Sequence, residues 1–366
     1  MNVFRSFRRA FLVFSLALIA AAQGSAALAS VVVYVSESKD DRIAVFSLDE
    51  ADGALSRIGE IVLDGSPGPL ALSPDGKHLY AAVRSTKEFA TLAIDRETGL
   101  LSMVALAPAS GSAPYVFPDP TGRWLLAAYY GEGLASVSRI VDGVVTGEPV
   151  SVVETGRKAH CIRTDPANRF ALVPHAGELN KVEQLRFDAE TGQLSANDPS
   201  AMAGGEGHGP RHLKFHPNGR WVYVVNEQGK SVTLCDYDAA KGTLAMRQTL
   251  STHPPDWDQE KGSCADIEIS ADGRFAYASN RGHDSIAVFA IDPETGELTS
   301  LGQTPTEKTP RSFNLVPGEE SYLVAAGQDA DKLVVYRRDP ESGALTNLAA
   351  YESGRSPAWV LGVKLD

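Results

Sequence analysis

The stretch DPETGEL at residues 292–298 belongs to a pattern, Asp-x-x-x-Gly-x-Leu, that recurs along the chain. The Asp side chain accepts hydrogen bonds from backbone two residues on, and the Gly adopts positive φ without steric cost, so each copy predicts a hairpin turn. A shortened copy, Asp142-Gly143, is typical of tight turns. The full copies begin at Asp49, Asp95, Asp188, Asp238, Asp292 and Asp339.

A second pattern alternates with the first: an apolar strand, a turn rich in Pro, Asp and Gly, and another apolar strand. Residues 70–81 hold one copy around Pro74-Asp75-Gly76, and residues 213–223 hold another around Pro217-Asn218-Gly219. Successive copies lie 46 to 54 residues apart, which leaves room for four short strands in each interval. Such repeat lengths are typical of β-propeller blades, although no Trp-Asp dipeptide of the WD40 kind recurs.

The two ends of the repeat region complete each other. In the second pattern we call the strand before the turn the inner strand and the strand after it the second strand. Residues 31–35 match a second strand but have no inner strand before them. Residues 357–363 match an inner strand but have no turn after them. We expect both in one blade, because closure removes the open sheet edges that invite aggregation. The sequence therefore predicts an all-β protein. Its fold is a seven-bladed β-propeller of four-stranded antiparallel blades over residues 30–366, closed by the C-terminal strand joining the N-terminal blade.

The first 29 residues have the composition of a signal peptide. Basic Arg5, Arg8 and Arg9 precede the apolar run 10–22, and Ala27-Leu28-Ala29 supplies small residues before a cleavage point at Ser30. The pair Arg8-Arg9 also fits a twin-arginine signal, so both export routes stay open. No later apolar run approaches membrane-spanning length. We expect a periplasmic or secreted protein with no membrane association.

Charge and cysteine content narrow the function classes. The formal charge is −12, and removal of three leader arginines changes it to 31 − 46 = −15, which argues against a nucleic-acid partner. Cys161, Cys235 and Cys264 each lie in an apolar stretch, so we expect buried free thiols rather than a disulfide framework.

Antiparallel order within a blade puts both repetitive turns on one face of the disc. Inner strands begin and second strands end on the opposite face near the axis, so we expect the chemistry there. Arginines, histidines and carboxylates in one place suit the binding and acid–base catalysis of an anionic, oxygen-rich ligand. The alternative is that the same residues form ordinary structural ion pairs. The candidates are Tyr115, His160, Arg211, His212, Asp266 and Arg311 at inner-strand starts, and Arg84, Tyr130, Glu227, Arg281 and Gln328 at second-strand ends.

Other chemical motifs are absent from the sequence. It has no Gly-x-Ser-x-Gly elbow, no Gly-x-x-x-x-Gly-Lys phosphate loop and no Cys-x-x-Cys. His208, His212 and His216 are spaced four apart, but they run from a loop into a strand rather than along a helix. We therefore expect neither a metal nor a cofactor.

Several motifs at the predicted rim carry a family resemblance. They are residues 209–217 (GPRHLKFHP), Val225-Asn226-Glu227, Ala265-Asp266-Ile267, residues 309–314 (TPRSFN) and residues 325–328 (AAGQ). Across essentially the whole mature chain the sequence resembles the β-propeller 6-phosphogluconolactonase family, whose superfamily also includes the carboxymuconate lactonising enzyme.

The resemblance implies a lactone-handling enzyme that needs no metal. Its proposed catalytic groups fall on His160, Glu227, Arg211 and Arg281. Glu227 or His160 would take a proton from water, and the two arginines would hold the anion and stabilise the oxyanion. The further substrate-binding candidates are His212, Arg311, Gln328, Arg84, Tyr130 and Asp266.

Two departures from the family bear on the substrate. An exported protein would rarely meet a phosphorylated sugar lactone of the cytoplasm, so we expect a different sugar-acid or acidic lactone. Tyr115 also stands where members often carry a histidine. A lactonising cycloisomerase and a non-catalytic binding propeller remain the alternatives. The expected partner is a small-molecule lactone, and we expect a monomer.

Overall fold

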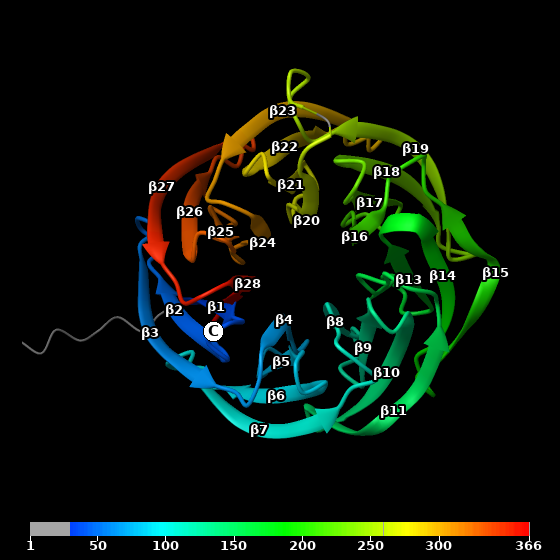
Figure 1. Cartoon of the computed structure of the whole chain (residues 1–366), viewed down its shortest axis with the longest axis horizontal. Coiled ribbons are helices and arrows are strands. Elements are labelled where there is room, and N and C mark those ends of the chain that lie inside the picture. Colours follow the sequence, from blue (N-terminus) through cyan, green and yellow to red (C-terminus); the bar gives the residue numbers. More distant parts are fainter. Residues whose placement is uncertain (1–29, 259, 366) are drawn as a thin grey trace, which may run out of the picture.

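The structure is a computed structural model that describes residues 30–258 and 260–365. Seven four-stranded antiparallel sheets stand around a central axis (Figure 1). This arrangement confirms the predicted seven-bladed propeller. The predicted signal peptide, residues 1–29, lies outside the described residues.

The strands follow one another from the axis outward in each blade, and blade 1 alone combines both ends of the chain. Blades 1 to 3 are, in this order, β28 (Pro357–Lys364), β1 (Val31–Glu37), β2 (Arg42–Leu48) and β3 (Leu55–Val62); β4 (Pro67–Leu72), β5 (His78–Val83), β6 (Glu88–Ile94) and β7 (Leu101–Pro108); β8 (Tyr115–Pro118), β9 (Trp124–Tyr129), β10 (Leu134–Val141) and β11 (Val144–Glu154). Blades 4 and 5 are β12 (Arg163–Thr164), β13 (Phe170–His175), β14 (Lys181–Asp188) and β15 (Gln193–Ala203); β16 (Pro210–Phe215), β17 (Trp221–Asn226), β18 (Ser231–Asp238) and β19 (Thr243–Ser251). Blades 6 and 7 are β20 (Ser263–Ile269), β21 (Phe275–Arg281), β22 (Ser285–Ile291) and β23 (Leu298–Pro305); β24 (Pro310–Leu315), β25 (Tyr322–Gly327), β26 (Lys332–Arg338) and β27 (Leu345–Glu352).

Closure of the ring takes place in blade 1. Strand β28 pairs antiparallel with β1, with Val31 opposite Lys364 and Val33 opposite Gly362. In Figure 1 the red end of the chain meets the blue beginning at the axis. The predicted closure is confirmed, and the innermost edge of blade 1 is supplied by the last strand of the chain.

Each repeated Asp-x-x-x-Gly turn connects the third and fourth strands of its own blade and contacts the neighbouring blade. At Gly99, φ is +75°, and the Asp95 side chain accepts hydrogen bonds from the amides of Glu97 and Thr98, as predicted for this turn. The carbonyl of the turn glycine then accepts a hydrogen bond from a tyrosine of the preceding blade. Four such contacts are Tyr34 to Gly99, Tyr80 to Gly143, Tyr223 to Gly296 and Tyr277 to Gly343, at 2.7–2.9 Å.

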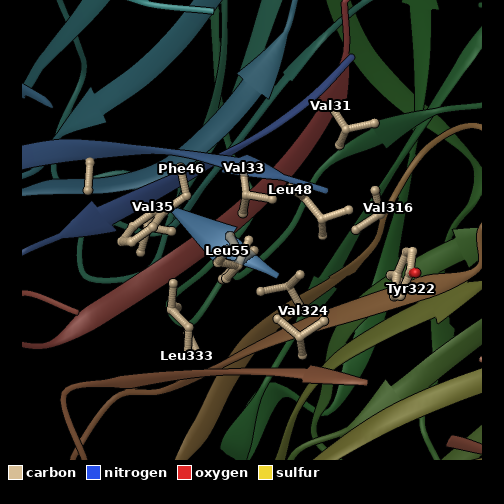
Figure 2. Close-up of a cluster of buried hydrophobic side chains, with 14 residues drawn as sticks. Val31, Val33, Val35, Phe46, Leu48, Leu55, Val316, Tyr322, Val324 and Leu333 are labelled. Carbon is tan, nitrogen blue, oxygen red and sulfur yellow. The ribbon is translucent and has the colours of Figure 1, made fainter. Parts of the chain in front are cut away.

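The apolar core lies between the blades. One cluster packs β1, β2 and β3 of blade 1 against β25 and β26 of blade 7, with Val33 and Val324 both fully buried (Figure 2). Alternate residues of a strand point to opposite faces, so each blade contributes to two such clusters. Burial of apolar surface contributes about 25 cal/mol per Å², so these clusters between blades are the main stabilising contribution to the fold.

Cys161, Cys235 and Cys264 are buried and free, as expected. Within the described residues the one helix is the short 3₁₀ turn η1 (Gly177–Leu179), and no helix could cross a membrane.

Candidate active site

The start of each inner strand lies on the face opposite the repetitive turns, and this placement gathers most of the predicted residues. We call this group the rim cluster. Several of its members are almost completely buried: Arg211 is 1 % exposed, His212 2 %, and His160 and Asp266 5 %. The rim cluster comprises Arg84, His160, Arg211, His212, Glu227, Asp266, Arg281 and Arg311.

Three side chains of the rim cluster, which come from three consecutive blades, form a hydrogen-bonded chain. Asp266 Oδ1 lies 2.8 Å from Nδ1 of His212, and Nε2 of His212 lies 3.2 Å from Nδ1 of His160. Arg211 Nη1 lies 3.3 Å from the same His212 Nε2. The ring of Tyr130 packs edge-on against His160, with 5.6 Å between the ring centroids.

The charges in this chain follow from its surroundings. Burial, and then the nearby charge of Arg211, lower the pKa of His212 to about 4 and hold the pKa of His160 well below 6.5. Burial alone would raise the pKa of Asp266, but contact with His212 and the charge of Lys214 lower it. Near neutral pH the chain therefore consists of a carboxylate and two neutral imidazoles.

The hydrogen bonds then decide the tautomers. A carboxylate only accepts, so His212 Nδ1 carries the proton and donates to Asp266, which leaves His212 Nε2 as an acceptor. His160 must donate from Nδ1 to that nitrogen. Nε2 of His160 is then unprotonated, and no described residue hydrogen-bonds to it. The arrangement supplies a neutral imidazole nitrogen able to accept a proton.

Glu227 lies between two arginines. Arg281 Nη2 donates to its Oε1 at 2.8 Å, and Arg211 Nε lies 3.5 Å from its Oε2. Burial alone would raise the pKa of Glu227, but Arg211 and Arg281 lower it, so it stays a carboxylate. These contacts suit a group that positions arginines better than one that must take up a proton.

The rim cluster holds more positive than negative charge. Burial, followed by the like charges of Arg311 and Arg281, lowers the pKa of Arg211 to about 9. Burial and the charges of Arg281 and Arg84 lower the pKa of Arg311 to about 10. Arg311 forms no hydrogen bond or ion pair with any described residue. An anion bound here would relieve this crowding.

A small cavity of about 10 Å³ lies at this rim. The side chain of Arg84 packs closely on Gly68, where a Cβ would lie 2.5 Å from Cδ of Arg84. Arg84 itself donates to Ser112 Oγ at 3.3 Å. The lining residues are Gly68, Pro69, Arg84, Pro114, His160, Arg211, Arg311, Ala358 and Trp359.

Two further predicted residues are not members of the rim cluster. Gln328 donates to Ser356 Oγ at 3.2 Å, and no described contact ties it to the rim cluster. Tyr115 lies deeper in the channel, where its ring meets His212 edge-on and its hydroxyl accepts a hydrogen bond from Arg163 at 3.2 Å. Trp359 completes this layer, 5.6 Å from Tyr115 between ring centroids, and was missed by the sequence reasoning. Alignment of β28 with the other inner strands would have indicated it.

The three spaced histidines do not come together as a metal site. His208 accepts from the amide of Gly205, whereas His216 contacts the Gly273 carbonyl on the turn face. No cluster of three or more metal-binding side chains occurs among the residues that the structure describes.

Comparison with known proteins places these features in a family. The model of the family "Lactonase, 7-bladed beta-propeller" matches residues 30–362. A 6-phosphogluconolactonase of Pectobacterium carotovorum is 35% identical over 336 residues, covering 92% of this chain and 99% of the relative. A 6-phosphogluconolactonase of Klebsiella pneumoniae is 35% identical over 331 residues, covering 90% and 98%.

A solved structure agrees with the sequence relatives. The periplasmic gluconolactonase of Pseudomonas aeruginosa superimposes with a TM-score of 0.82 at 26% identity, covering 92% of this chain and 100% of that one. Fold, sequence and coverage therefore agree, and the chain belongs to the lactonase family of seven-bladed β-propellers.

Proposed function

We propose that this protein is an extracytoplasmic lactonase that hydrolyses an acidic or sugar-acid lactone at the rim cluster. The observation that carries the proposal is the chain Asp266–His212–His160, whose last residue lines the same cavity as the unpartnered Arg311. A neutral base and an unsatisfied cation in one cavity are the two groups that lactone hydrolysis requires.

In the proposed reaction, Nε2 of His160 removes a proton from water as the water oxygen bonds to the lactone carbonyl carbon. Arg311 and Arg211 stabilise the carbonyl oxygen as it becomes an oxyanion. Collapse of this intermediate breaks the ring C–O bond, and the proton on His160 passes to the leaving alkoxide. Glu227 positions Arg281 and Arg211 through the contacts described above. One water is consumed and one carboxylic acid is formed.

The location outside the cytoplasm rests on the leader-like residues 1–29 and on the similarity to a periplasmic gluconolactonase. It also favours an unphosphorylated substrate. Cell fractionation with N-terminal sequencing should recover a chain that begins at Ser30 outside the cytoplasm. A cytoplasmic chain that retains residues 1–29 would contradict this part of the proposal.

The activity is tested by pH-stat titration of the purified protein, after subtraction of spontaneous hydrolysis. The substrates are glucono-δ-lactone, 6-phosphoglucono-δ-lactone and muconolactone. We expect the sugar-acid lactone to open, and His160→Ala to lose about a thousandfold in rate because it removes the base. Glu227→Gln should lose more than about tenfold through misplaced arginines. Absence of turnover on every lactone, or a wild-type rate in His160→Ala, would overturn the proposal.

A further inference from the structure

The central channel contains a second cavity, of about 250 Å³, on the side of the repetitive turns. It begins beneath Tyr115, Asp266 and Trp359 and reaches Pro74 and Pro118 beside those turns. The ring contacts among Tyr115, His212 and Trp359 lie between this cavity and the rim. The second cavity belongs to a different level of the channel from the rim cluster.

One residue from each inner strand lines this level at an equivalent register. Each residue pairs with the matching position of the second strand in its own blade, such as Ala71 with Tyr80 and Lys214 with Tyr223. Blades 1 to 3 contribute Leu361, Ala71 and Phe117, which are apolar. Blades 4 to 7 contribute Arg163, Lys214, Glu268 and Asn314. The ring is therefore apolar on one side and polar on the other.

Three of the polar residues satisfy one another. Lys214 Nζ lies 2.7 Å from Glu268 Oε2, and Asn314 Nδ2 donates to Glu268 Oε1 at 3.4 Å. Arg163 differs from them. Its guanidinium stacks on Phe117 with Cζ 4.7 Å from the ring centroid, and it donates to the Tyr115 hydroxyl. Within residues 30–258 and 260–365 Arg163 forms no ion pair. Its charged guanidinium group, with N–H donors still available, therefore faces the cavity.

We propose that this cavity is a second ligand site, which takes a small organic carboxylate with an apolar body. The carboxylate pairs with Arg163, whose planar fork matches carboxylate geometry. The apolar body lies against Leu361, Ala71 and Phe117. An apolar wall combined with a few converging polar groups is what small-molecule sites commonly show. The inference stands independently of the proposed lactonase activity.

The probe is 4-fluorobenzoate, followed by ¹⁹F NMR titration of the full-length mature protein. We expect saturable binding in the millimolar range or tighter. Arg163→Gln should weaken it at least about tenfold, because the charge-assisted pair is lost. Ala71→Leu should weaken it as well, since it places in blade 2 the side chain that blade 1 carries at Leu361 and fills the cavity without changing charge. Arg311→Gln should leave this binding within about twofold, because Arg311 lies at the rim.

Thermal unfolding confirms that each variant is folded, and Arg163→Lys is the alternative if Arg163→Gln does not fold. No saturable binding by the wild-type protein up to about 20 mM would overturn the proposal. Binding that Arg311→Gln abolishes, or that both Arg163→Gln and Ala71→Leu leave unchanged, would overturn it too, because the probe would then occupy the rim.

Discussion

Blades 1–3 and blades 4–7 present different chemistry to the same channel. At the rim, residues at or just before the inner strands of blades 4, 5 and 7 are His160, Arg211 and Arg311, whereas those of blades 1, 2 and 3 are the uncharged Ala358, Trp359, Gly68 and Pro114. The same division recurs at the turn-side cavity, where apolar residues face a polar half. The backbone repeat fixes where a side chain lies, and the individual blade decides what that side chain can do.

The two groups of blades therefore have different roles at the rim. Blades 1–3 contribute mostly uncharged residues at the rim, with Arg84 of blade 2 as the exception, and blades 4–7 contribute His160, Arg211 and Arg311. Variants in blades 4–7 should therefore lose activity, whereas variants in blades 1–3 should lose stability.

After the loss of the base in His160→Ala, the largest expected effect comes from Asp266→Asn in blade 6. The variant keeps the shape but replaces an acceptor with an amide that can donate to His212 Nδ1, which reverses the tautomers along the chain. We expect kcat/KM for lactone opening to fall about 100-fold with little change in melting temperature. The matched control is Asp236→Asn, on an outer strand beside Arg247.

Asp266 acts through His212, so a second readout is needed to separate positioning from simple structure. The pH dependence of kcat/KM in the wild type should stay flat through pH 6.5 and fall only in stronger acid, since the pKa of His160 is depressed and its neutral form is the active one. In Asp266→Asn this profile should shift. An unchanged rate and profile would mean that the histidine chain is structural only.

A smaller effect is expected from Arg311→Gln in blade 7. Loss of one unpartnered cation should lower kcat about tenfold and change KM less, because the oxyanion that Arg311 stabilises forms only in the transition state. Arg337→Gln, an exposed arginine of the same blade, is the control. Steady-state kinetics on the lactone would refute the assignment if both variants gave the same kcat.

The smallest effect on activity is expected in blade 1. Val363, on β28, is 1 % exposed, and Val363→Ala should lower the free energy of unfolding by about 2 kcal/mol through lost burial and a residual cavity. kcat/KM should stay within about twofold of wild type. A loss of activity that exceeds the loss of folded protein would remove the distinction between the two halves.

The sequence predicted the architecture well because turn chemistry is local. Gly99 and its equivalents need positive φ wherever they occur, so the repeat could be counted, and closure through residues 357–363 followed from the unpaired ends. The same count put His160, Arg211 and Arg311 on one rim. The leader, the substrate and the catalytic roles remain predictions.

The contacts inside the rim cluster could not be predicted in this way. Whether His212 faces Asp266 or the substrate depends on rotamers and on spacing between blades, which no repeat encodes. Gln328 shares its place in the repeat with Glu227, yet its contact is with Ser356. Arg163 escaped notice because it lies two residues before a turn, on the side of the disc where only structural roles were expected.

The central claim is that blades 4–7 hold a neutral His160 whose Nδ1 carries the proton and whose Nε2 is free. ¹⁵N NMR of the histidine ring nitrogens at neutral pH tests it directly. We predict Nδ1-protonated neutral tautomers for both His160 and His212, and His212 should protonate only near pH 4. An imidazolium at neutral pH, or a proton on Nε2 of His160, would contradict the account.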